Sequence, residues 1–306
     1  MGFMLKLRKN FPLKPLSTFK IGGKARFFVE VNNEKEFFEA IKKSKELDIP
    51  YAVFGGGSNV VFPDGLLNYL LIKLNIGGSE ILGLKIVVGA GLNLAKVIKT
   101  ANKNGLAGLE TLAGIPGTIG GAIVGNAGAY GHSISEVVEK VEAWNGTIKK
   151  WISNMECHFQ YRESIFKNKP WIILRAVLRF KKGKAEKLKK ISAGIMRFRN
   201  KKYKKRLRCP GSFFKNVLAG GVSKRSSELI DENKIIGGKI PAGYLLEQAG
   251  ANGMKFGGIK VADFHGNLLV NQGGATAKDV RKAAKALKER VYRKFGIHLE
   301  EEVRYF

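Results

Sequence analysis

The chain has 306 residues, of which 44% are hydrophobic and 26% charged, a composition typical of a soluble globular protein with two or three domains. Lys and Arg number 54 against 25 Asp and Glu, and the net charge of +29 favours anionic ligands or nucleic acid. No apolar run approaches the ~18 residues that span a bilayer, and none resembles a secretory leader, so we expect a cytoplasmic protein without membrane attachment.

The sparse cysteines and histidines argue against a metal site or a disulfide framework. Cys157 and Cys209 are the two cysteines, and the four histidines are scattered. Neither residue type has the spacing of a metal-binding motif. This usage fits a reducing compartment.

The first 105 residues predict strands that alternate with helices. Hydrophobic side chains alternate at 26–31, as in a strand, and recur at helical spacing over 34–47. With a further strand beginning at Pro50, this pattern predicts a β-α-β unit. The next expected elements are strands at 69–74 and 85–88 and a helix over 94–104 that ends at Gly105.

Two glycine-rich segments stand out. The first reads FGGGSN at 54–59, after an apolar strand-like run, and the second is GLETLAGIPGTIGGAIVGNAGAYG at 108–131. Backbones so rich in glycine can approach a large flat or phosphorylated ligand closely, although glycine clusters also form ordinary tight turns. Neither segment matches the dinucleotide fingerprint or the P-loop, so a standard Rossmann or Walker site is excluded.

The remainder of the chain predicts a strand-rich region, a basic helix and a third segment. Strands are expected at 137–144, 148–152 and 172–180, with a hairpin turn at Asn145-Gly146. The basic run at 181–208 predicts a helix, with a domain boundary near 201–208. Beyond it we expect a helix at 243–249, strands at 259–262 and 268–271, a final helix from the capping pattern Thr276–Asp279 to Gly296, and a last strand over 297–306.

The densest positive charge lies at 181–208, where Glu186 is the single acid. A solvated helix face with a linker explains such a run, and so does a nucleic-acid surface. We expect the former, with no specific nucleic-acid partner.

Six motifs in chain order resemble the UDP-N-acetylenolpyruvoylglucosamine reductase family, in its shorter type without the extra tyrosine loop. They are LSTFKIGG (16–23), FGGGSNVVFPDG (54–65), GIPGTIGGAIVGNAGAYG (114–131), YRES (161–164), GSFFKN (211–216) and LEEEVR (299–304). The resemblance implies an FAD enzyme that uses NADPH to reduce an enolpyruvyl ether of a UDP-sugar to UDP-N-acetylmuramate, a peptidoglycan precursor.

The resemblance also implies the fold and the domains. The fold class would be α+β, with an FAD-binding fold of the vanillyl-alcohol-oxidase type in two α+β subdomains and a C-terminal α+β substrate domain. The expected bounds are 1–72, 73–204 and 205–296, with the strand at 297–306 joining the first subdomain. We expect a monomer.

The same resemblance assigns the binding residues. FAD would be held by residues of the two glycine-rich segments: Gly55, Gly56, Gly57, Ser58, Asn59, Gly114, Pro116, Gly117, Thr118, Gly120, Gly121, Asn126 and Gly128. The substrate would be bound by Tyr161, Lys215, Asn216 and His265, with Lys215 and Asn216 facing the diphosphate.

Three residues would carry the chemistry. Reduction of an enol ether needs a cation for the carboxylate, a group that stabilises the enolate-like intermediate, and an acid that protonates the adjacent carbon. Arg162 suits the first role because a guanidinium binds a carboxylate through two hydrogen bonds. By resemblance, Ser212 is the proton donor and Glu302 stabilises the intermediate, although Glu300 and Glu301 are close alternatives.

The chain departs from the family pattern before and after Ser212. Cys209 lies three residues before Ser212 and is a second candidate for the proton donor, and Val217 stands where the family usually has proline. Two other functions stay open: another flavin oxidoreductase of the same fold, which the ordered motifs disfavour, and a basic nucleic-acid-binding protein, which would not need two glycine-rich segments.

Overall fold

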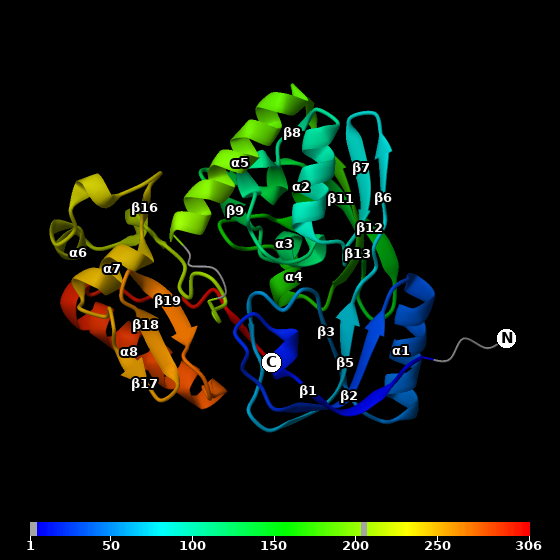
Figure 1. Ribbon diagram of the computed structural model, residues 1–306, viewed down its shortest axis with the longest axis horizontal. Helices are drawn as coiled ribbons and strands as arrows, with labels where there is room; N and C mark the ends of the chain where they lie inside the picture. The colour runs from blue at the N-terminus through cyan, green and yellow to red at the C-terminus, as the bar shows by residue number, and fades with distance from the viewer. Residues whose placement is uncertain (1–4, 203–206) are drawn as a thin grey trace. The chain divides into compact units, whose positions relative to one another are not determined.

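The computed structural model describes residues 5–202 and 207–306. The described residues form two compact units (Figure 1). Of the described residues, unit 1 takes 5–11, 25–56 and 68–202, and unit 2 takes 12–24, 57–67 and 207–306. The predicted boundary at 204/205 falls outside the described residues, and the three domain bounds stay a prediction.

Unit 1 contains a four-stranded sheet in the order β1-β2-β5-β3. Its strands are β1 (Arg8–Pro12), β2 (Lys24–Val31), β5 (Leu66–Leu74) and β3 (Tyr51–Phe54). Helix α1 (Glu34–Glu46) follows β2 and begins where the Asn33 side chain accepts a hydrogen bond from the Glu36 N–H. The predicted β-α-β unit is present, but β5 lies between its two strands and pairs in parallel with β3.

A second, antiparallel sheet of unit 1 has the order β12-β11-β13-β7-β6. The strands are β12 (Lys149–Ser153), β11 (Val138–Trp144), β13 (Ile172–Arg179), β7 (Lys85–Gly89) and β6 (Ser79–Leu82). All of them except β6 lie within a residue or two of the predicted bounds. The first two are joined at Asn145-Gly146, where the Asn145 side chain accepts hydrogen bonds from two backbone N–H groups.

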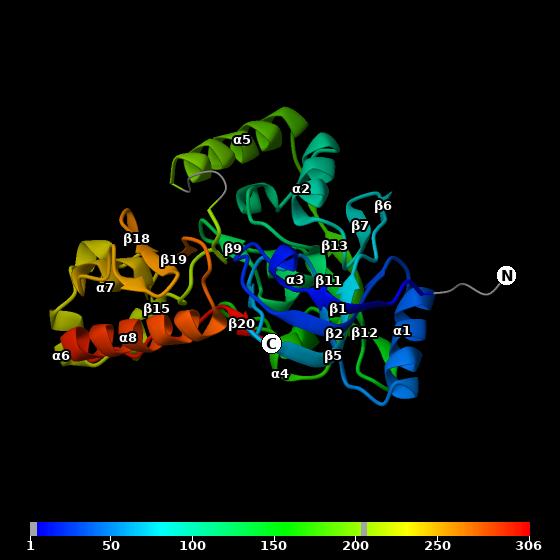
Figure 2. The ribbon, with the colours of Figure 1, turned by 60° about the horizontal axis from the view of Figure 1, so that its bottom comes forward.

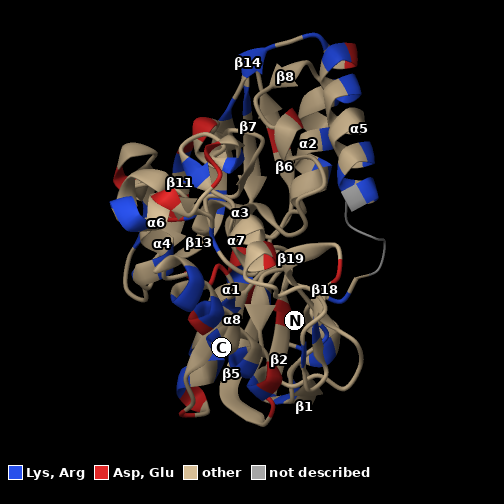
Figure 3. Ribbon diagram, turned by 90° about the vertical axis from the view of Figure 1, so that its left-hand side faces the viewer, with Lys and Arg blue, Asp and Glu red and all other residues tan. Residues whose placement is uncertain are grey.

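The basic run forms helix α5 (Ala185–Lys202), which packs beside α2 (Leu94–Lys103) (Figure 1). Its Ser192 hydroxyl accepts a hydrogen bond from buried Asn102 and donates one to the Glu110 carbonyl. Lys and Arg lie along the helix (Figure 3). The predicted helix is confirmed, and the part of the run at 203–206 lies outside the described residues.

Unit 2 has its own apolar core, built around two helices and a three-stranded antiparallel sheet. Helix α7 (Ala242–Gln248) contacts β19 (His265–Asn271), and helix α8 (Ala277–Phe295) contacts β18 (Ile259–Ala262) (Figure 2). Strand β17 (Lys255–Phe256) completes the sheet (Figure 1). The predicted final helix is confirmed at both ends, because Thr276 and Asp279 form a capping box and Gly296 adopts φ 67°.

The last ten residues differ from the prediction of a continuous strand. Regular strand is limited to β20 (Arg304–Tyr305), which pairs in parallel with β4 (Val60–Val61). The residues before it bury Leu299 and Val303 and make a single bridge, between Glu301 and Phe214. The alternation of apolar and polar side chains therefore predicts correctly which residues are buried here. The segments that pair with residues 297–306 are too short for a continuous strand ladder to form.

Several short elements were not predicted from the sequence. They are α3 (Ile119–Val124), α4 (Ile165–Asn168), α6 (Lys224–Glu228), β8 (Leu106–Ala107), β9 (Gly128–Ala129), β10 (His132–Ser133), β14 (Lys181–Lys182), β15 (Val217–Leu218) and β16 (Lys239–Ile240), together with 3-10 turns at Lys14–Leu16, Glu110–Leu112, Ile134–Glu136, Met155–Cys157, Ala219–Gly221 and Glu232–Lys234. Among the described helices, none is long and apolar enough to cross a membrane.

Candidate active site

The two glycine-rich segments meet within unit 1. A Cβ atom on Gly56 would lie 3.0 Å from the Gly117 Cα, and one on Gly55 would lie 2.4 Å from the Thr118 Oγ1. Gly56 therefore lies against the backbone of Gly117 and Gly55 against the side chain of Thr118, and side chains on these two glycines would prevent both contacts. Among the described residues, none accepts a hydrogen bond from the N–H of Gly55 or Gly56. These amides can donate to an anionic ligand, so this part of the chain fits the phosphates of FAD.

Helix α3 is held against this contact by its cap and by a glycine. The Thr118 hydroxyl accepts a hydrogen bond from the Gly121 N–H, and the Gly120 N–H donates one to the Ala90 carbonyl. Position 120 has no room for a larger residue, because a Cβ there would lie 3.0 Å from the Ala90 Cβ. Gly114 adopts φ 83° and packs under Met196 of α5. Pro116 lies between Gly114 and Thr118 in the chain and also interacts with other residues.

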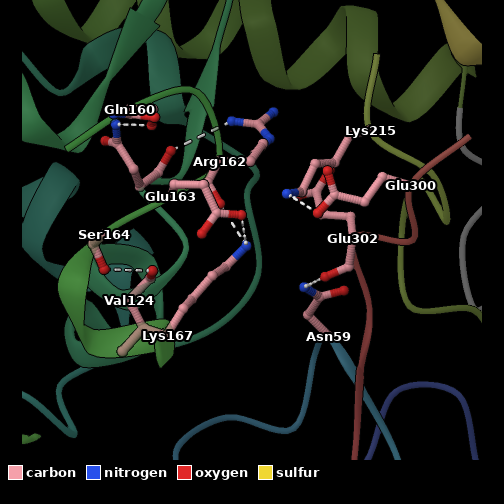
Figure 4. Close-up of polar contacts among 11 residues, drawn as sticks. Asn59, Val124, Gln160, Arg162, Glu163, Ser164, Lys167, Lys215, Glu300 and Glu302 are labelled. Atoms are coloured by element: carbon pink, nitrogen blue, oxygen red, sulfur yellow. Dashed lines mark hydrogen bonds and ion pairs between the residues drawn. The ribbon is translucent and has the colours of Figure 1, made fainter. Parts of the chain in front are cut away.

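The remainder of the first segment belongs to unit 2. Gly57 adopts φ 65°, and a Cβ there would lie 1.9 Å from the Leu16 carbonyl oxygen. The Ser58 carbonyl accepts from the Thr18 hydroxyl. Asn59 donates through Nδ2 to the Glu302 carbonyl at 3.1 Å, and its own carbonyl accepts from the Arg304 N–H (Figure 4). These residues tie the glycine-rich segment to the C-terminal residues.

Arg162 lies on a tight turn with a left-handed backbone, φ 58°. Its guanidinium donates to the Gly128 carbonyl at 2.8 Å and to the Asn126 carbonyl at 3.5 Å. Asn126 is buried, has φ 39° and donates through Nδ2 to the Gln160 carbonyl. The second glycine-rich segment and the Tyr161-Arg162 motif are therefore one hydrogen-bonded assembly.

Lys167 of α4 also stabilises the turn at Arg162. Its ammonium donates to the Arg162 carbonyl at 2.5 Å and pairs with Glu163 at 3.1 Å (Figure 4). The Ser164 hydroxyl donates to the Val124 carbonyl. The Arg162 guanidinium lies 5.3 Å from the centre of the Tyr161 ring, within the range of a cation–π contact.

Ser212 lies in unit 2, directly before a segment that pairs with the C-terminal residues. Gly211 before it adopts φ 91° with open space around it. After it, the Phe213 carbonyl accepts from the Glu302 N–H at 2.8 Å. Buried Asn267 accepts from the N–H groups of Phe213 and Phe214 and donates to the Phe214 carbonyl. The backbones around Ser212 and Glu302 are thus held together within unit 2, and the roles of the two side chains stay a prediction.

The three glutamates have different surroundings. Glu300 is 70% exposed and pairs with Lys215, whose side chain is 8% exposed (Figure 4). Glu301 pairs with Lys288 and accepts a hydrogen bond from the Tyr305 hydroxyl. Burial and this hydrogen bond raise the pKa of Tyr305, so the phenol stays protonated. Glu301 is therefore committed to local structure, and the choice of Glu302 as the reacting carboxyl stays a prediction.

Asn216 and His265 make contacts that stabilise unit 2. The Asn216 Oδ1 accepts from the Ala242 N–H and so caps α7, whose Pro241 has no capping side chain. His265 lies against α7, where a Cβ on Gly243 would be 2.6 Å from the imidazole, and its Nδ1 is 3.4 Å from Glu247. Their predicted substrate contacts stay a prediction.

The alternative donor, Cys209, is half-buried in the same loop as Ser212. Burial raises the pKa of the Cys209 thiol, and the backbone N–H of Gly211 offsets this in part. Burial raises the pKa of Cys157 to about 12. Both thiols are therefore protonated at neutral pH.

Sequence reasoning missed the residues that position the site. Asn126 was selected for the cofactor, but its links to Gln160 and Arg162 were not predicted, and neither Lys167 nor Asn267 was selected. For Lys167 the available signal was its i,i+4 spacing from Glu163. Asn267 stands in an apolar strand, where a buried amide needs partners that only tertiary structure supplies.

Comparisons with known proteins identify the class first. Residues 25–149 match the model of an FAD binding domain, and residues 201–306 match that of the UDP-N-acetylenolpyruvoylglucosamine reductase C-terminal domain. The chain is a flavoprotein of α+β fold with an FAD-binding domain followed by this C-terminal domain, which confirms the predicted fold class.

Full-length relatives identify the family. The chain is 42% identical to a UDP-N-acetylenolpyruvoylglucosamine reductase from Solibacter usitatus, over 98% of this chain and 97% of the relative. It is 34% identical to one from Bacillus subtilis, over 97% and 93%. The crystal structure of the reductase from Thermus caldophilus superimposes with a TM-score of 0.75 at 28% identity, covering all of both chains. The chain belongs to the UDP-N-acetylenolpyruvoylglucosamine reductase family.

Proposed function

We propose that this protein reduces UDP-N-acetylenolpyruvoylglucosamine to UDP-N-acetylmuramate, a peptidoglycan precursor, with FAD and with NADPH as the reductant. The observation that carries the proposal is the match, over nearly the full length of both chains, to a reductase with that name. The backbone hydrogen bond from the Glu302 N–H to the Phe213 carbonyl brings together the segments that carry two of the residues proposed for the chemistry. A monomer located in the cytoplasm is part of the same proposal.

Arg162 binds the carboxylate of the enolpyruvyl group in this proposal. Its guanidinium is held by two backbone carbonyls, so its orientation is fixed before substrate arrives. A carboxylate bound by a guanidinium withdraws electron density from the double bond, and the bond then behaves as a conjugated acceptor. FAD, when bound, supplies the hydride chemistry.

Ser212 then protonates the carbon next to the one that is reduced. A serine hydroxyl is a weak acid, so it can act only toward a strongly basic carbanion or with help from a neighbour. Glu302 stabilises the negative charge that develops on the substrate. Its carboxyl group must be protonated or paired with a cation to do so, because a free carboxylate would repel that charge.

The roles of Ser212 and Cys209 are separated by the two half-reactions. In Ser212→Ala, NADPH should bleach the FAD absorbance at a near-normal rate, while reoxidation by the enolpyruvyl substrate should slow by about 100-fold to 10,000-fold. Cys209→Ala is the matched control, from the same loop, and should reoxidise normally. Stopped-flow absorbance measures both steps. Normal reoxidation in Ser212→Ala together with a loss in Cys209→Ala would transfer the role to Cys209.

A further inference from the structure

Unit 2 contains an open pocket of about 490 Å³ on its surface. It lies where the N-terminal segment of unit 2 meets the loop after β19, and its lining includes neither a residue assigned above to FAD nor one assigned to the substrate. The lining residues are Lys14, Pro15, Lys20, Arg208, Asn271, Gly274 and Ala275.

The charge of this pocket is entirely positive. Lys14, Lys20 and Arg208 come from separate parts of the chain, and all three are exposed. Among residues 5–202 and 207–306, none of these cations forms an ion pair with a carboxylate, and the lining contains no Asp or Glu. The Lys20 ammonium donates to the Pro15 carbonyl at 3.1 Å, which leaves its full charge uncompensated.

Buried Asn271 organises the pocket. Its side chain, in a residue that is 5% exposed, donates to the carbonyls of Phe19 and Lys20 at 3.0 and 3.1 Å, and its backbone N–H donates to the Arg208 carbonyl at 2.9 Å. Lys20 has a left-handed backbone, φ 58°, which this pair of hydrogen bonds helps to hold. One buried residue thus fixes the backbones that carry two of the cations.

We propose that this pocket binds a phosphate group of a small, multiply charged anion. Three unpaired cations around one hollow repel one another, and a phosphate relieves that repulsion with charge-assisted hydrogen bonds. The volume exceeds what a single phosphate fills and lies within the range of small-molecule sites. The phosphate comes either from a free anion such as pyrophosphate or from the 2′-phosphate that distinguishes NADPH from NADH.

Calorimetric titration of the FAD-loaded protein with inorganic pyrophosphate, at fixed ionic strength, tests the site. The double variant Lys20→Gln/Arg208→Gln should weaken pyrophosphate binding at least about tenfold, because two charge-assisted hydrogen bonds are lost. The control Lys224→Gln/Lys285→Gln removes the same charge from exposed positions of unit 2 outside the pocket, and it should bind as the unchanged protein does. Equal weakening in both variants, or no effect in either, would overturn the proposal.

Steady-state kinetics separates the two sources of phosphate. If the 2′-phosphate is the ligand, the pocket variant should raise the KM for NADPH about tenfold and leave the KM for NADH unchanged. If the ligand is a free anion, both KM values stay unchanged while pyrophosphate binding is still lost. The calorimetry does not depend on the proposed reaction, so a protein that failed to reduce the UDP-sugar could still confirm this site.

Discussion

Arg162 is held in a backbone conformation that L-residues rarely adopt. A left-handed non-glycine residue costs on the order of 1–3 kcal/mol and persists only where its surroundings enforce it. The Lys167 ammonium, bound to the Arg162 carbonyl, and the carbonyls of Asn126 and Gly128 supply that enforcement. The strain lies at the residue that the proposed mechanism needs most.

Lys167→Met should therefore loosen the Arg162 turn. We expect the KM for the enolpyruvyl substrate to rise about tenfold, since a misplaced guanidinium loses the geometry of a two-point carboxylate contact. Lys167→Arg should restore part of the loss, because a cation is again present. Lys169→Met, an exposed neighbour, is the control. A lowered melting temperature with an unchanged KM would show that Lys167 serves stability alone.

The role of Glu302 can be distinguished from the roles of Glu300 and Glu301 by comparing glutamine variants of the three residues. Glu302→Gln should slow FAD reoxidation by the substrate and leave reduction by NADPH intact. Glu301→Gln should instead lower the melting temperature, because Glu301 pairs with Lys288 and Tyr305. A larger kinetic loss in Glu300→Gln would assign the role two residues earlier. Rapid-mixing spectroscopy and thermal unfolding of the three variants measure these outcomes.

At the scale of elements, Glu34 links α1 to the second sheet of unit 1. Its carboxylate pairs with Lys149 of β12 at 2.7 Å and accepts from the Arg175 Nε of β13 at 3.0 Å. Burial opposes ionisation, but the hydrogen bonds from Lys149 and Arg175 outweigh it and hold the pKa of Glu34 below its ordinary value of 4.5.

Glu34→Gln should cost about 1 kcal/mol at pH 7, since both basic partners are partly exposed, which corresponds to roughly 2–4 °C in melting temperature. A carboxylate with a lowered pKa stabilises the fold above pH 4.5, and this contribution is lost as the pH falls through the lowered value. The difference between variant and parent should therefore vanish in acid. Glu46→Gln, at the exposed end of α1, should change little. A difference that stays constant as the pH falls from 7 to well below 4.5 would mean that packing, not charge, is responsible.

Elements with strong local signals were predictable from the sequence, and those made by tertiary contacts were not. The Thr276–Asp279 capping box and Gly296 define α8 locally, and its bounds were predicted correctly. The strand at 297–306 was wrong because its partner, around Phe214, is a loop. Likewise, the sequence motifs selected Arg162, but only the fold shows the carbonyls and the lysine that orient it.

Over the whole molecule, the net charge of +29 is distributed among several local surfaces and does not serve a single site. Lys and Arg side chains lie along α5, which packs on α2 through the hydrogen bond from buried Asn102 to Ser192. Other cations surround Asn271 and line a pocket. That the run at 181–208 has no specific nucleic-acid partner stays a prediction. Any binding of DNA or RNA there should fall steeply as salt rises.

The reaction proposed for this protein is the FAD-dependent reduction of an enolpyruvyl UDP-sugar. The most direct measurement mixes the NADPH-reduced protein with UDP-N-acetylenolpyruvoylglucosamine in the absence of oxygen and follows the FAD absorbance and the mass of the product. We predict rapid return of the oxidised spectrum and a product that has gained two hydrogens. FAD that stays reduced until oxygen is admitted, with the substrate recovered unchanged, would show that the protein does not catalyse this reaction.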